Sequence, residues 1–154
     1  MIDAEHPRRA LDSPFESGTV GDAMSRGVIS CTPETPLRIV ARLMATYGVH
    51  AIFVFDHTDE DDEARQLWAV VSDLDLVAAT RLDLDTLTAG ATAVTPLVSV
   101  SSESAIATAG ALMAEHGVAH LAVTDPVSQR PIGVISTLDI AEAIAAGDVQ
   151  VAER

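Results

Sequence analysis

The chain has 154 residues, and a hydrophobic content of 48% is too high for a disordered chain and sufficient for one ordinary domain or two small ones. Its net charge of −14, with no lysine, would repel nucleic acid and anionic membrane surfaces, so we expect neither as a partner. The single cysteine, Cys31, excludes an intramolecular disulfide, and no apolar run reaches the roughly 18 residues of a membrane span. These features predict a soluble cytoplasmic protein.

The first part of the chain is polar and interrupted by prolines. Residues 1–18 contain Pro7 and Pro14 and have no apolar core, so we expect a flexible N-terminal arm and no signal peptide. A short helical turn is expected over residues 20–26. This region therefore leads into the folded part of the chain without adding a domain of its own.

A strand, a helix and a second strand follow. Residues 28–31 read as a short strand, and Thr35 is placed to cap a helix whose first residue is Pro36. Apolar residues then recur at helical spacing, and Gly48 is placed to end the helix. Residues 51–55 are apolar on both faces, which predicts a strand covered on both sides.

The next stretch, residues 56–66, contains five consecutive acidic residues. Like charges at this density resist packing, so we expect a solvated hairpin loop. A cation site is the weaker alternative, because the spacing does not match a calcium-binding loop. A strand over residues 67–71 and a helix over residues 73–81 complete this part of the chain.

The sequence then repeats itself. Residues 48–56 match residues 117–125 at an offset of 69, and past the hairpin the offset falls to 64, because the acidic loop lengthens the first hairpin. Each copy predicts the order strand, helix, strand, strand, helix. We therefore expect a first repeat over residues 19–82, a second over residues 83–148, and a C-terminal tail over residues 149–154.

Each repeat contains the same strand-to-helix corner. In the second repeat, Ser136 follows a β-branched strand and Asp139 comes three residues later, and Ser72 and Asp75 have the same spacing in the first repeat. A serine followed three residues later by an acid is also an ordinary helix-capping box. The corners are therefore either ligand sites or plain helix caps.

The repeated β-α-β-β-α order, the Gly-Val segments at Gly48 and Gly117 and the paired corners resemble a tandem CBS-domain pair, or Bateman module. The resemblance covers about residues 19–147. It implies a mixed α+β fold in which two pseudo-twofold-related repeats pack through their sheets and leave two clefts. The family usually has glycine where this chain has Ala69, and the added methyl group would crowd the first cleft.

In the family these clefts bind AMP, ADP, ATP or S-adenosylmethionine. The corner aspartate accepts hydrogen bonds from the ribose hydroxyls, the serine lies beside the phosphate or ribose, and apolar residues enclose the adenine, all of which is compatible with the chemistry of these groups. The positions that match form two sets: Val134, Ser136, Asp139 and His120 with Ile29 and Val49 from the partner repeat, and Val70, Ser72, Asp75 and His50 with Val98 and Val118. The alternative for both histidines is a structural, half-buried side chain.

No set of catalytic residues can be assembled, so we expect no enzyme activity, no metal site and no obligatory cofactor. The resemblance implies a regulatory module that senses an adenosine-containing ligand, and the scarcity of cations favours AMP or S-adenosylmethionine over ATP. The alternative is a structural dimerisation module whose clefts bind nothing. In either case we expect a homodimer through the helices over Leu37–Tyr47 and Ile106–His116, with an unknown effector protein as a further possible partner.

Overall fold

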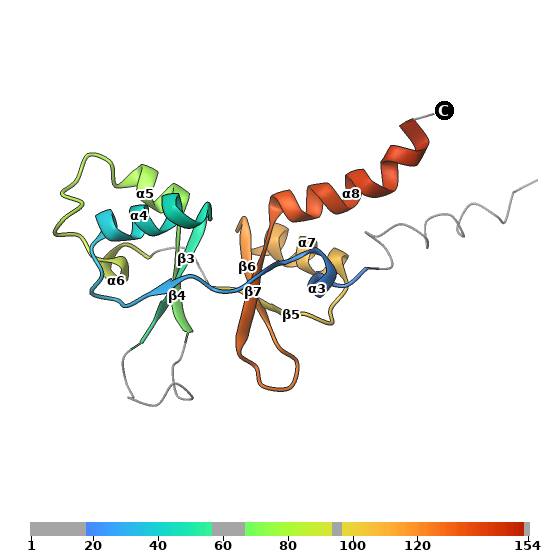
Figure 1. Ribbon diagram of the computed structural model, residues 1–154, viewed down its shortest axis with the longest axis horizontal. Helices are drawn as coiled ribbons and strands as arrows, with labels where there is room; N and C mark the ends of the chain where they lie inside the picture. The colour runs from blue at the N-terminus through green and yellow to red at the C-terminus, as the bar shows by residue number, and fades with distance from the viewer. Residues whose placement is uncertain (1–17, 57–66, 94–96, 153–154) are drawn as a thin grey trace, which may run out of the picture. The chain divides into compact units, whose positions relative to one another are not determined.

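The computed structural model describes residues 18–56, 67–93 and 97–152, which form two compact units (Figure 1). Unit 1 comprises Met1–Gly27 and Val98–Arg154, and unit 2 comprises Val28–Leu97. The predicted N-terminal arm, apart from its last residue, and the acidic run lie outside the described residues.

Unit 2 contains a three-stranded sheet and three helices. Its elements are β2 (Ser30–Cys31), α4 (Leu37–Tyr47), β3 (Ala51–Phe55), β4 (Leu67–Ser72), α5 (Asp73–Ala78) and α6 (Ala89–Thr92). The strand order is β2-β3-β4, with β2 parallel and β4 antiparallel to β3. Apolar residues of α4, including Leu37 and Val40, pack against Ile52 and Val71 of the sheet to form the core.

Unit 1 repeats this arrangement with one more strand. Its elements are α3 (Val20–Ala23), β1 (Ser25–Arg26), β5 (Ser99–Ser101), α7 (Ile106–His116), β6 (His120–Thr124), β7 (Pro131–Ser136) and α8 (Thr137–Ala152). The strand order is β1-β7-β6-β5. The predicted repeat is confirmed: α4 and α7 both have 11 residues and end at Gly48 and Gly117, whose φ angles are 64° and 63°. Helix α8 continues to Ala152, into the segment expected to be a tail.

The first helix of each repeat packs on the unit formed by the rest of the other repeat. Helix α3, at the start of the first repeat in sequence, lies in unit 1, and α6, near the start of the second repeat, lies in unit 2. Equivalent backbone hydrogen bonds of 2.8 Å hold both helices: Val20 N to Ser104 O and Gly21 N to Ser102 O in unit 1, and Ala89 N to Thr35 O and Gly90 N to Pro33 O in unit 2. The sequence repeats and the structural units therefore do not coincide at their N-terminal ends.

Strand β1 adds a fourth strand to the sheet of unit 1. Arg26 pairs with Gly133 and Ser25 pairs with Val134. A Cβ atom at Gly133 would collide with the carbonyl oxygen of Ser25 and stand 2.9 Å from Met24 Sδ, so this approach requires glycine. The equivalent residue of β4 is Ala69, and β4 is an edge strand among the described residues of unit 2.

The prediction that Thr35 caps α4 is wrong. The helix begins at Leu37, and the residue at its N-cap position is a proline that offers no side-chain acceptor. The first amide groups of the helix instead donate to the linker, residues 79–88 between α5 and α6: Leu37 N to Leu87 O at 2.9 Å and Arg38 N to Leu84 O at 3.0 Å. A distant backbone segment thus satisfies donors that would otherwise need a local cap.

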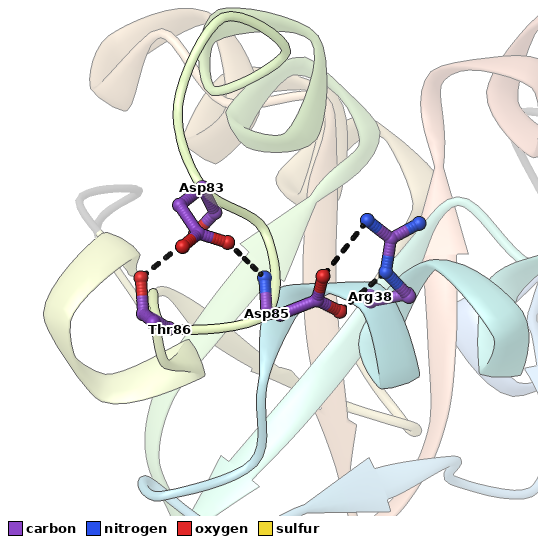
Figure 2. A network of polar contacts seen from close by, with 4 residues as sticks. All are labelled: Arg38, Asp83, Asp85 and Thr86. Atoms are coloured by element: carbon purple, nitrogen blue, oxygen red, sulfur yellow. Dashed lines mark hydrogen bonds and ion pairs between the residues drawn. The ribbon is translucent and has the colours of Figure 1, made fainter.

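Side chains also connect α4 to this linker (Figure 2). The guanidinium of Arg38 donates from Nε and Nη2 to the two carboxylate oxygens of Asp85. Asp85 N donates to Asp83 Oδ1 at 3.0 Å, and Thr86 Oγ1 donates to the carbonyl oxygen of Asp83 at 3.3 Å. The hydrogen bond from Arg38 lowers the pKa of Asp85 below its ordinary value, and the same pair raises the pKa of Arg38.

Candidate functional site

The second corner is the point where β7 passes into α8. Ser136 N donates to Asp139 Oδ2 at 2.8 Å, Ser136 Oγ donates to the same oxygen at 3.0 Å, and Asp139 N donates to Ser136 Oγ at 3.3 Å. These are the reciprocal bonds of a capping box, and they form because the serine ends the strand while the acid falls on the first turn of the helix. The capping prediction is therefore confirmed here.

The first corner has the same cap in a more buried setting. Ser72 N donates to Asp75 Oδ2 at 2.9 Å, and Asp75 N donates to Ser72 Oγ at 3.3 Å. The exposed fractions of Ser72 and Asp75 are 7% and 8%, whereas Ser136 and Asp139 are half-buried. The first corner therefore gives solvent, or a ligand, much less access to its carboxylate.

The corners also differ in the length of the helix that follows, and the carboxylate of the second corner has an oxygen outside the cap. Asp139 uses Oδ2 for the cap, and its Oδ1 accepts no hydrogen bond from the described part of the chain. Helix α8 has 16 residues, whereas α5 has six. A carboxylate oxygen that the cap does not use can accept a hydrogen bond from a ligand hydroxyl while the cap stays intact.

The two predicted histidines lie in different places. His50 Nδ1 lies 3.0 Å from Oδ2 of Asp73, the first residue of α5, and the side chain of His50 is 67% exposed. His120 is half-buried and lies opposite Ser136 in the β6–β7 pair. The second corner thus has a histidine beside its serine, and the first has a histidine paired with a carboxylate.

The predicted apolar residues divide between the units. Val134 and Val70 lie in β7 and β4, two residues before the serines of their own corners. Ile29 and Val49 pack on the core of unit 2, whereas Val98 and Val118 pack on the core of unit 1. The structure therefore brings together the residues that each corner takes from its own repeat. The contributions expected from the partner repeat remain predictions.

An apolar groove lies between α7 and α8, which run side by side in unit 1 (Figure 1). It has a volume of about 490 Å³ and is lined by Gly110, Met113, Ala114, Gly117, Val118, Ala119, Thr137 and Ile140. The sequence analysis did not predict this groove. The signal was present in the small residues Gly110 and Ala114, four positions apart on one face of α7, and in Gly117, which follows the helix.

Other chemistry finds little support in the described ranges. No group of three or more histidine, cysteine, aspartate or glutamate side chains within residues 18–56, 67–93 and 97–152 is arranged to hold a metal ion. None of the described helices is both long and apolar enough to cross a membrane. Burial raises the pKa of the Cys31 thiol, which reduces its thiolate fraction and hence its reactivity.

Comparison with known proteins gives a family match. The CBS domain family matches residues 20–81 and 91–146. No curated protein gives a significant match.

Several solved structures are similar over most of the chain. Hypoxic response protein I, with two coordinated zinc ions, is 26% identical, with 80% of this chain and 97% of that chain covered and a TM-score of 0.62. The CBS domain protein PAE2072 from Pyrobaculum aerophilum, complexed with AMP, is 24% identical, with coverages of 83% and 99% and a TM-score of 0.67. The CBS domain pair of MJ0100, in complex with 5-methylthioadenosine and S-adenosyl-L-methionine, is 13% identical, with coverages of 82% and 95% and a TM-score of 0.69. The last two likenesses support the fold alone.

Proposed function

The chain belongs to the CBS domain family, and from this premise we propose that it is a regulatory module that binds an adenosine-containing ligand at its strand-to-helix corners. The observation that carries the proposal is the carboxylate of Asp139, which caps α8 with Oδ2 and leaves Oδ1 without a partner in the described residues. Similar folds are known in complex with AMP and with S-adenosyl-L-methionine, which supports the choice of ligand class.

The second corner supplies the main contacts in this proposal. Oδ1 of Asp139 accepts a hydrogen bond from a ribose hydroxyl, and Ser136 lies beside the ribose or phosphate. Val134 forms part of the adenine wall, and His120 lies near the phosphate. Ile29 and Val49 complete this set, and the first corner forms the second: Val70, Ser72, Asp75 and His50 with Val98 and Val118.

The charge of the chain bears on which ligand binds. Nine arginines stand against 23 acidic residues, so few cations are available to neutralise a triphosphate. We therefore place AMP or S-adenosylmethionine, whose sulfonium is positive, ahead of ADP and ATP. Backbone amides at the start of α8 supply the remaining attraction for a single phosphate.

The proposed role is regulatory and not catalytic. A ligand that binds one conformation more tightly shifts the equilibrium between conformations, and a partner senses that shift. The expected partners are a second copy of the chain and an effector protein of unknown identity. Such a sensor of adenosyl metabolites belongs in the cytoplasm, where those ligands are made.

Isothermal titration with AMP, ADP, ATP and S-adenosylmethionine tests the proposal. We expect saturable binding of AMP or S-adenosylmethionine to the wild type, and a loss of affinity of at least about tenfold in Asp139→Ala. Asp22→Ala is the matched control, because Asp22 caps α3 with the same reciprocal bonds but belongs to neither corner, so its affinity should stay at the wild-type value. The absence of binding heat with all four compounds would contradict the proposal.

A second candidate is a structural dimerisation module without a ligand. It is favoured by the hydrogen bonds to the Asp139 carboxylate, which come from Ser136 of the same corner, and by exposed apolar side chains on the helices, among them Leu74 and Ile39. Such a module would dimerise, and its melting temperature would not change when any of the four compounds is added. Light scattering and thermal melting with the same four compounds separate the two candidates.

A further inference from the structure

The apolar groove between α7 and α8 is open to solvent. Gly110 has no side chain, and a Cβ atom there would meet only Ile140 Cδ1, at 3.8 Å, so the groove is wide at this point. Its volume of about 490 Å³ is enough for bulky apolar side chains. Exposed apolar surface of this kind marks an interaction site, so we expect a segment of protein to cover it.

The chain enters unit 1 beside this groove. Thr19 pairs with Ala105, the residue just before α7, and α3 contacts both α7 and α8. Ala23 and Met24 pack against the same core as Ile140, which lines the groove. The N-terminal arm, whose residues 1–17 lie outside the described residues, therefore joins the described chain at the N-terminal end of α7.

This attachment point puts two apolar residues of the arm within reach of the groove. Phe15 is four residues before Thr19, and an extended chain spans at most about 14 Å over that distance. Gly110 lies about 8 Å along α7 from the residue that pairs with Thr19. Leu11 has four further residues of chain, which is more than it needs to reach Ala114, one helical turn beyond Gly110.

The residues of the arm suit the groove chemically. Leu11 and Phe15 are four positions apart, a spacing typical of the apolar anchors that dock into hydrophobic grooves, and Phe15 is the one phenylalanine of the chain outside β3. Arg8 and Arg9 are the only adjacent arginines in the sequence, whereas every fixed charge on the described side chains of α7 and α8 is acidic. The arm as a whole is acidic, so residues 8–11 are the part that these charges attract.

We propose that the groove between α7 and α8 binds residues 8–15 of the same chain, with Leu11 and Phe15 as the apolar anchors. This inference goes beyond the proposed function and does not depend on it. The groove takes Thr137 and Ile140 from the first turn of α8, and these two share one face of the helix, whereas Asp139 lies on another. The arm and a ligand at the second corner can therefore bind at the same time.

Disulfide trapping in the intact chain tests the pairing. In a Cys31→Ser background, Leu11→Cys is combined with Ala114→Cys, whose position is exposed and lines the groove. We expect an intramolecular disulfide, seen as a faster-migrating monomer on a non-reducing gel, to form at least about tenfold faster than in the control. The matched control is Leu11→Cys with Val127→Cys, at a 90% exposed site in the β6–β7 turn. Equal rates would overturn the proposal, and so would a disulfide-linked dimer, which would place the arm of a second copy in the groove.

Hydrogen exchange gives a second test that introduces no cysteine. Leu11→Glu and Phe15→Glu should each speed exchange of the backbone amides of residues 110–118 by at least about threefold, because undocking of the arm exposes this part of α7. Ser13→Glu adds the same charge to the arm without removing an anchor, so its amides should exchange at the wild-type rate. Unchanged exchange in the two anchor variants, or equally fast exchange in Ser13→Glu, would overturn the proposal. None of these positions belongs to a corner, so the titrations that test ligand binding are independent of the result.

Discussion

Unit 1 and unit 2 share one β-α-β-β-α order, one pair of glycine-terminated helices and one capping box, yet they differ around the corner. In unit 2 the corner serine and aspartate are buried and the helix that follows is short. In unit 1 the corresponding residues are half-buried, the helix is long, and a fourth strand lies against the corner. The features that the two units share are those that each unit needs to fold stably.

These differences indicate which corner aspartate is accessible to a ligand. Asp75 is buried in its cap, so we expect its main effect to be on stability. Asp139 is half-buried, and its Oδ1 accepts no hydrogen bond from the described residues, so we expect it to affect both stability and binding. The two repeats thus share a scaffold but differ at their corners.

The largest expected effect comes from the contact between β1 and β7. Gly133→Ala should lower the free energy of unfolding by about 2–3 kcal/mol, because the added methyl group displaces Ser25 and Met24 from β7. Urea denaturation measures the change. Ala69→Gly is the matched control, since it removes a methyl group at the equivalent position of β4, and it should cost no more than about 1 kcal/mol. Equal costs in the two units would show that β1 does not depend on glycine.

The two corner aspartates provide the next comparison. Asp75→Ala should cost about 2 kcal/mol, because it leaves the buried Ser72 N–H without its acceptor. Asp139→Ala should cost about 1 kcal/mol, because water can reach the half-buried Ser136 N–H. Chemical denaturation of both variants at neutral pH measures which substitution lowers the free energy of unfolding more. The reverse order would contradict the assignment of the first corner as the more structural one.

Helices α3 and α6 each lie in the unit formed by the rest of the other repeat, and the costs of removing their caps should differ by less. Thr19 and Asp22 cap α3 reciprocally, whereas Thr88 caps α6 through a single bond of 3.3 Å to Ala91 N. Thr19→Val should therefore cost about 1 kcal/mol and Thr88→Val about 0.5 kcal/mol, measured by urea denaturation. Indistinguishable costs would mean that the side-chain caps contribute little to either exchanged helix.

The smallest expected effect concerns the ion pair between Arg38 and Asp85. Both side chains are exposed, so Asp85→Asn should lower the melting temperature slightly, and less so at high salt. Because the folded pKa of Asp85 is lowered, the pair contributes fully above the ordinary value of 3.8 and is lost as the pH falls through the folded pKa. The difference from the wild type should therefore shrink in acid. A difference that grows below pH 3.8 would contradict the sign.

Local rules account for the part of the fold that could be predicted. Gly48 and Gly117 end their helices in the left-handed conformation, and both Ser-x-x-Asp corners form capping boxes, because each depends on residues within four positions. The order of strands and helices could be predicted because the two repeats show the same local patterns, so each copy supports the assignment of the other.

Contacts between distant segments account for what could not be predicted. The first amides of α4 bond to Leu84 and Leu87, more than 40 residues away, so local spacing pointed wrongly to Thr35 as the cap. The exchange of α3 and α6 between units leaves no periodic signal either. For the candidate site, the local cap at Asp139 could be predicted, whereas the unequal burial of the two corners depends on tertiary packing.

The central claim is that Asp139 accepts a hydrogen bond from a ribose hydroxyl, and titration of AMP against 2′-deoxy-AMP tests it most directly. In the wild type, we predict that removing the hydroxyl weakens binding by about tenfold, the loss of a hydrogen bond to a charged group. In Asp139→Ala the two compounds should bind alike. Equal affinities in the wild type, or a preference for AMP that survives in Asp139→Ala, would contradict the claim.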